Sequence, residues 1–184
     1  MNKVEPIKVA LWFINQNLDN PANSRDGNMK LQKLLFFSQL IYMCQNKGKT
    51  MYKEEFNAFE HGMVLETVRL TYQNNYEMLC NNSNLADELP EDVEKALVLT
   101  KEIFGKCSAN ELSDMSHQFK AWNKFFTRSI NKNGGYDKNK SRVPYNELKE
   151  ELYKMQKVLS AYESSSKITE EEDEDYWRLK KDTF

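Results

Sequence analysis

The chain has 184 residues, of which 40% are hydrophobic and 12% are aromatic, so it can form one domain with a sizeable core and an appendage. Its 26 basic and 28 acidic residues give a net charge of -2, which excludes a global positive field that would attract nucleic acid or an anionic membrane. Its three cysteines lack C-x-x-C spacing, and its first residues lack the apolar stretch of a signal peptide. These features predict a cytoplasmic protein with reduced thiols.

The first predicted helix begins at Pro6, because proline is tolerated in a first turn. Its apolar stripe recurs at helical spacing as far as Leu18. Residues 19–27 are rich in turn formers and predict a loop.

The central helix is predicted over residues 28–48 and is apolar nearly all round, with Gly48 as its stop. Its clearest polar line consists of Gln32, Gln39 and Asn46. Such a helix is normally buried in its own domain. We therefore expect a mainly α-helical, compact domain built around this buried helix. Lys30 and Lys33 lie on its first turn, where exposure would let them join a basic patch.

Residues 50–61 predict a small β-hairpin whose two extended segments flank Lys53 to Glu55, with Gly62 ending it. A third helix is then marked by Val64, Val68 and Tyr72 and is expected to fray before Cys80.

Residues 81–89 predict a polar loop, and a helix follows from Pro90 to Gly105. Ser108 and Glu111 form a capping-box pattern at the start of another helix. Apolar residues at helical spacing continue that helix as far as Trp122.

Residues 128–142 predict a basic, glycine-containing loop, and a last long helix starts at Pro144. The apolar seam of this helix consists of Tyr145, Leu148, Leu152, Met155, Leu159 and Tyr162. Its strict spacing suits either a groove of the same domain or a partner helix.

Serines at 164–166 predict a boundary between a domain over residues 1–163 and an acidic tail over residues 164–184. The tail has six consecutive acidic residues followed by Tyr176 and Trp177, and the chain ends at Phe184. Because aromatic residues are typical interface anchors, these three side chains are the predicted partner contacts of the tail.

The sequence offers little for catalysis, metal or cofactor binding, so we expect a protein that is not an enzyme and has no cofactor. His61 and His117 would form a metal site with Asp114 or Glu60 only if the fold fixed their spacing. Cys107 and His117 make a weak catalytic dyad without an obvious third member. Gly134 and Gly135 lack the context of a phosphate-binding loop.

Four motifs, in order, resemble the Panacea domain, the SocA-like antitoxin family also seen in phage-associated GepA-type proteins. Residues 29–37 resemble its M-K-L-Q-K-L-L-Y-F opening, and residues 56–64 resemble F-x-A-W-x-x-G-P-V with methionine in place of proline. Residues 107–113 and 114–122 are similar to S-A-x-x-L-S and to L-T-H followed by tryptophan. The shared motif residues are Lys30, Leu31, Gln32, Lys33 and Gly62, with His61, His117 and Trp122 beside them.

The resemblance implies a helical antitoxin that neutralises a cognate protein toxin, usually encoded by the adjacent gene, through direct binding. The motif residues then serve either the fold or the toxin interface. One alternative is an adaptor that delivers the toxin to a protease. Another is a phage or mobile-element protein that binds nucleic acid through residues 128–142. The sequence leaves open whether the free protein forms a homodimer.

Overall fold

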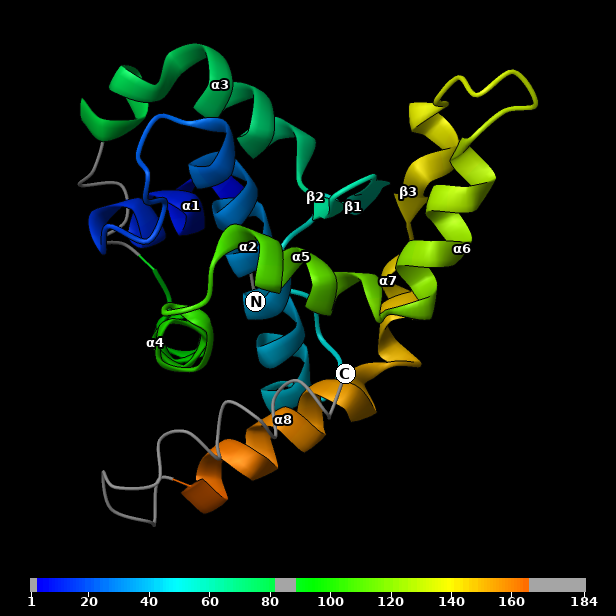
Figure 1. Cartoon of the computed structure of the whole chain (residues 1–184). Coiled ribbons are helices and arrows are strands. Elements are labelled where there is room, and N and C mark those ends of the chain that lie inside the picture. Colours follow the sequence, from blue (N-terminus) through cyan, green and yellow to red (C-terminus); the bar gives the residue numbers. More distant parts are fainter. Residues whose placement is uncertain (1–2, 82–88, 166–184) are drawn as a thin grey trace.

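A computed structural model describes residues 3–81 and 89–165 (Figure 1). Its helices are α1 (Pro6–Asn15), α2 (Arg25–Gln45), α3 (Glu66–Asn81), α4 (Glu91–Phe104), α5 (Ala109–His117), α6 (Lys120–Ser129), α7 (Tyr145–Lys149) and α8 (Leu152–Ser165). Its strands are β1 (Phe56–Phe59), β2 (Gly62–Val64) and β3 (Arg142–Val143), and a 3-10 turn, η2, spans Lys138–Ser141. The fold is mainly α-helical with a small antiparallel sheet, as predicted.

Helix α2 crosses the middle of the molecule, as Figure 1 shows, and packs against α1, α3, α4, α5, α8 and β2. It begins three residues earlier than predicted, because the Ser24 hydroxyl caps it by accepting from the Gly27 N–H. It ends at Gln45, with Asn46 as its C-cap, and Lys47 and Gly48 then adopt positive φ. The prediction of a buried central helix is therefore confirmed.

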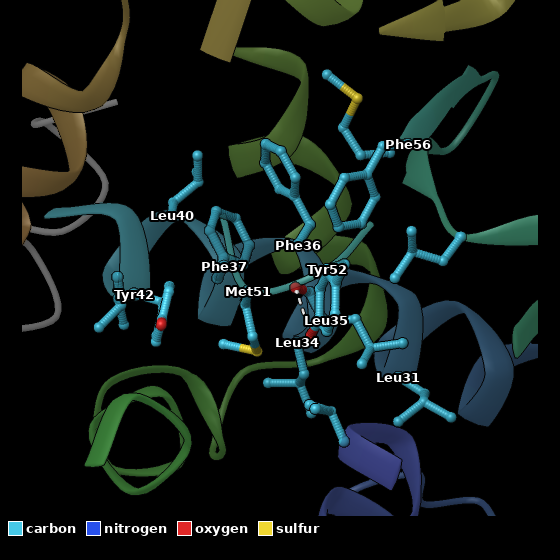
Figure 2. Close-up of a cluster of buried hydrophobic side chains, with 14 of the residues drawn as sticks. Leu31, Leu34, Leu35, Phe36, Phe37, Leu40, Tyr42, Met51, Tyr52 and Phe56 are labelled. Atoms are coloured by element: carbon cyan, nitrogen blue, oxygen red, sulfur yellow. Dashed lines mark hydrogen bonds between the residues drawn. The ribbon is translucent and has the colours of Figure 1, made fainter. Parts of the chain in front are cut away.

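The core is centred on the middle of α2, where aromatic rings from several elements meet (Figure 2). Phe37 stacks on Phe104 of α4 with ring centroids 4.4 Å apart. Phe36 makes edge contacts with Phe56 and with Phe119 at 5.4 and 5.2 Å. Such offset and edge-to-face geometries add to the free energy gained from burial.

The predicted polar line of α2 does not face water. Gln39 is 0% exposed and Gln32 is 2% exposed. The Gln39 side-chain oxygen accepts from the N–H groups of Met51 and Tyr52, each at 3.1 Å. The Gln32 oxygen accepts from the Leu65 N–H at 2.9 Å. These two amides, seven residues apart, thus hold the chain that runs beside α2.

The hairpin exists, but its predicted position was wrong. Its turn lies at residues 60–61, between β1 and β2, and not at residues 53–55. Gly62 begins β2 with φ +100 rather than ending the hairpin, a backbone conformation that favours glycine. β3, from the predicted basic loop, adds a third strand beside β1.

Two of the predicted helices are each divided into two, and Glu151 lies at one of these breaks and caps the helix that follows the other. The helix expected to reach Trp122 ends at His117, and α6 starts afresh at Lys120. The Glu151 carboxylate accepts from the N–H groups of Lys120 and Ala121 at 2.8 and 2.7 Å, which caps α6. Glu151 itself lies between α7 and α8, where the predicted last helix divides.

The seam of that last helix packs on its own domain. Leu148 and Met155 are fully buried, and α8 contacts α2. Of the remaining predictions, α4 buries its expected face, whereas α1 stops at Asn15 and not at Leu18. Helix α3 continues to Asn81 through a kink at Asn75. The acidic tail with Tyr176, Trp177 and Phe184 lies outside the described residues.

Candidate functional site

A pocket of about 600 Å³ opens where the first turns of α2 meet the β1–β2 turn and α3. Its lining residues are Asn23, Ser24, Arg25, Asn28, Met29, Gln32, Lys33, Phe59, Glu60, His61, Val64, Arg69, Tyr72 and Gln73. The volume is typical of small-molecule sites. The pocket brings the motif residues Gln32 and Lys33 together with His61.

Lys33 lies at this pocket with only 1% of its surface exposed, so the prediction that it could join an exposed basic patch was wrong. Its Nζ donates to the Met63 carbonyl at 2.9 Å. Burial lowers the pKa of Lys33 to about 7, because desolvation disfavours the charged amine. Helical periodicity could not reveal this burial, because α2 is covered on every side.

Arg25 and His61 meet at the mouth of the pocket, where both side chains are exposed. The Arg25 guanidinium lies 3.1 Å from the His61 Nε2. Since arginine can only donate, the His61 Nε2 is the acceptor in this hydrogen bond. Arg25 precedes the family motif, and no sequence signal singled it out.

Arg69 is the third basic residue of the lining, and its charge is already compensated. Its Nε and one terminal nitrogen donate to the two carboxylate oxygens of Glu66 at 2.7 and 2.9 Å. Lys138 also pairs with Glu66 at 3.1 Å. The pKa of Glu66 is held below its ordinary value, chiefly by the hydrogen bond from Arg69.

His117 and Trp122 lie next to each other behind the β1–β2 turn. Their rings stack with centroids 3.9 Å apart, and the Trp122 Nε1 donates to the Phe59 carbonyl at 2.8 Å. Burial, and then the charge of Lys33, lower the pKa of His117. Within the described part of the chain, the His117 Nε2 is buried without a hydrogen-bond partner.

Lys30, Leu31 and Gly62 make contacts within the fold. The Lys30 Nζ donates to the Gly105 carbonyl at the end of α4, and Leu31 is fully buried. A Cβ on Gly62 would overlap the Ser116 hydroxyl and lie 2.9 Å from the Lys33 Nζ. The motif thus joins α2 to α4, α5 and the hairpin.

The described residues contain no group of three or more histidine, cysteine or acidic side chains that could hold a metal ion. They also contain no helix with the length and apolar character needed to cross a membrane. In the basic loop, Lys138 and Lys140 pair with Glu66 and Asp137, and the Arg128 guanidinium lies over the Phe125 ring. This leaves the loop less positive than its sequence implies.

Comparison with known proteins gives one result. The family model for the antitoxin SocA-like, Panacea domain matches residues 31–123, which is half of the chain. No curated protein and no solved structure matches. The matched residues include α2 from Leu31, the hairpin and Trp122, so they contain all the named motif residues except Lys30 and most of the pocket's lining. The chain therefore belongs to the SocA-like antitoxin family and carries its Panacea domain.

Proposed function

We propose that this protein is the antitoxin of a toxin–antitoxin system and neutralises a cognate toxin by binding it directly. Family membership over residues 31–123 is the observation that carries the proposal. The mechanism is steric: the antitoxin covers the active surface of the toxin and needs no catalytic group of its own.

The proposed contacts come from three places. His61 is exposed at the β1–β2 turn, and Trp122 and His117 lie behind it. The outer face of α8 presents Tyr153, which is 48% exposed. The tail supplies Tyr176, Trp177 and Phe184, whose aromatic side chains are suited to anchoring an interface.

The proposal is tested by co-expressing the protein in the cytoplasm with the product of the adjacent gene and scoring growth and co-purification together. Rescued growth with a stable complex supports direct neutralisation. Loss of the toxin that depends on a protease would favour delivery by an adaptor. A harmless neighbour that does not co-purify would contradict the proposal.

Three variants locate the interface in the same assay. Deletion of residues 166–184 tests the tail, and His61→Ala tests the hairpin turn, where the side chain is exposed. Lys95→Gln is the matched control, because Lys95 is exposed on α4 and pairs only with Glu91. A folded variant that no longer rescues growth marks a toxin contact, and full rescue by the deletion would rule out the tail.

A further inference from the structure

We propose that the pocket at the start of α2 binds a small molecule through a phosphate or carboxylate group, held between Lys33 and Arg25. Nothing in this proposal depends on the toxin. Three observations support it: a cavity, two basic side chains without a counter-charge among the described residues, and neighbouring polar groups that already form hydrogen bonds within the protein.

The charges around the pocket favour an anionic ligand. No carboxylate of the described residues lies within ion-pair distance of Lys33 or Arg25, whereas the other lining cation, Arg69, is bound to Glu66. The only carboxylate in the lining is Glu60, which is exposed at the hairpin turn. A buried ammonium without a counter-charge is costly. An anion in the pocket would supply that charge.

Lys33 and Arg25 also have hydrogen-bond donors that an anion could use. When protonated, the Lys33 amine has three N–H groups, and among the described residues it donates one of them, to the Met63 carbonyl, so it has donors left for a ligand. Arg25 contacts the His61 Nε2 through one terminal nitrogen, which leaves the rest of its planar fork. Both residues line the same cavity.

Several other polar side chains of the lining already form hydrogen bonds within the protein. The Gln32 amide bonds Leu65 and Asn28, and the Asn28 amide donates to the Arg69 carbonyl at 3.1 Å. The Tyr72 hydroxyl donates to Asp19 and accepts from the Asn23 N–H. These hydrogen bonds occupy the side chains of Gln32, Asn28 and Tyr72, so Lys33 and Arg25 are the basic groups of the lining that are left for an anion.

The size of the cavity selects the class of ligand. A volume of about 600 Å³ is larger than an isolated phosphate or acetate needs and falls in the range of drug-sized ligands. Phe59, Val64 and Met29 provide apolar lining for the body of such a molecule. The ligand class is thus an anionic head group on a planar or apolar body, as in a nucleoside monophosphate.

The test measures thermal unfolding of the full chain with AMP, citrate or inorganic phosphate, each compared with sodium chloride at equal ionic strength. AMP at about tenfold excess over its Kd should raise Tm by about 4 °C, whereas citrate and inorganic phosphate, which lack a planar or apolar body, should raise it less. Lys33→Met and Arg25→Gln should each weaken binding about 10- to 100-fold. Lys95→Gln, an exposed lysine outside the pocket, should bind as the parent does.

Arg25→Gln still tests the proposal if Lys33→Met fails to fold, because Arg25 is exposed and, among the described residues, its side chain bonds only His61. The proposal is overturned if AMP does not raise Tm beyond the chloride control, or if inorganic phosphate alone gives the same shift as AMP. It is also overturned if Arg25→Gln leaves the full shift in place. A pocket that accepts only a side chain of the toxin would give the first of these negative results.

Discussion

Gln39 and Lys33 are both buried polar residues of α2, but their surroundings differ. Near its middle, Gln39 is fully buried, and its oxygen is saturated by two backbone N–H groups. Two turns earlier, Lys33 is almost as deeply buried, yet it holds a single carbonyl and borders an open pocket. The Gln39 Nε2 is buried without a hydrogen-bond partner among the described residues, so the two positions differ in access and not in spare bonding capacity: Gln39 is enclosed in the core, whereas Lys33 borders a cavity that a ligand could enter.

The largest effect should follow from crowding the glycine that faces Lys33. Gly62→Val combines a φ of +100 with overlap against Ser116, and we expect it to cost about 4 kcal/mol of unfolding free energy. Gly134→Ala is the control, because Gly134 also has positive φ but its Cβ would meet nothing within 4 Å. Urea denaturation of both variants should show a clear gap, and equal losses would contradict the packing described at Gly62.

The next effect compares the two glutamines directly. Gln39→Ala leaves the buried N–H groups of Met51 and Tyr52 without an acceptor. It should lower the free energy of unfolding by about 3 kcal/mol. Gln32→Ala strands only the Leu65 N–H beside a pocket that admits water, so about 1.5 kcal/mol is expected. Gln156→Ala on exposed α8 surface should be nearly neutral. A Gln32 variant that is the less stable of the two would break the comparison.

The charge of Lys33 should make stability depend on pH. Its folded pKa of about 7 lies below the unfolded value of about 10.4, so between these values the unfolded chain binds more protons and wild-type stability rises with pH. The rise is at most about 1.4 kcal/mol per pH unit. Urea unfolding of wild type and Lys33→Met at pH 7, 8 and 9 measures it as the difference between the two proteins.

Subtracting the Lys33→Met values removes the other groups that titrate in this window. The wild type should gain stability relative to the variant as the pH rises from 7 to 9. The exposed Lys95→Met variant should show no such trend over the same range. A flat difference for Lys33→Met would mean that Lys33 is not buried as an uncompensated amine.

The smallest effect is expected where a bond lies close to water. The Tyr136 hydroxyl donates to the Ala58 carbonyl at 3.0 Å, but Tyr136 is 38% exposed. Tyr136→Phe should therefore cost only about 1 kcal/mol, measured as a shift in the urea midpoint. If Tyr136→Phe lost as much unfolding free energy as Gln39→Ala, the cost of losing a hydrogen bond would not depend on its exposure to water.

The sequence predicted the parts of the fold that depend on local pattern. The apolar face of α4 and the capping box of Ser108 and Glu111 are both present, because neighbouring residues alone determine them. The break between α5 and α6 was missed, since Glu151, from a distant segment, caps α6. β3 was missed because a strand of two residues has no periodicity to detect.

The candidate site was predicted only in part, for a related reason. The motif pointed to Gln32, Lys33, Gly62 and His61, but it did not reveal that Lys33 is buried beside a cavity. Arg25 lies in the first turn of α2, directly after the Ser24 cap and before the motif, and it lines the pocket. Burial and pocket shape are set by tertiary packing, which residue spacing does not encode.

The central claim, that this Panacea-domain protein neutralises its toxin by direct binding, is tested most directly with purified components and no protease present. The toxin's activity is measured while the antitoxin is titrated in, and the mixture is analysed by size-exclusion chromatography. If neutralisation is direct, inhibition should saturate at a fixed ratio of antitoxin to toxin and coincide with a stable complex. A toxin that stays fully active in excess antitoxin, with no complex formed, would contradict it.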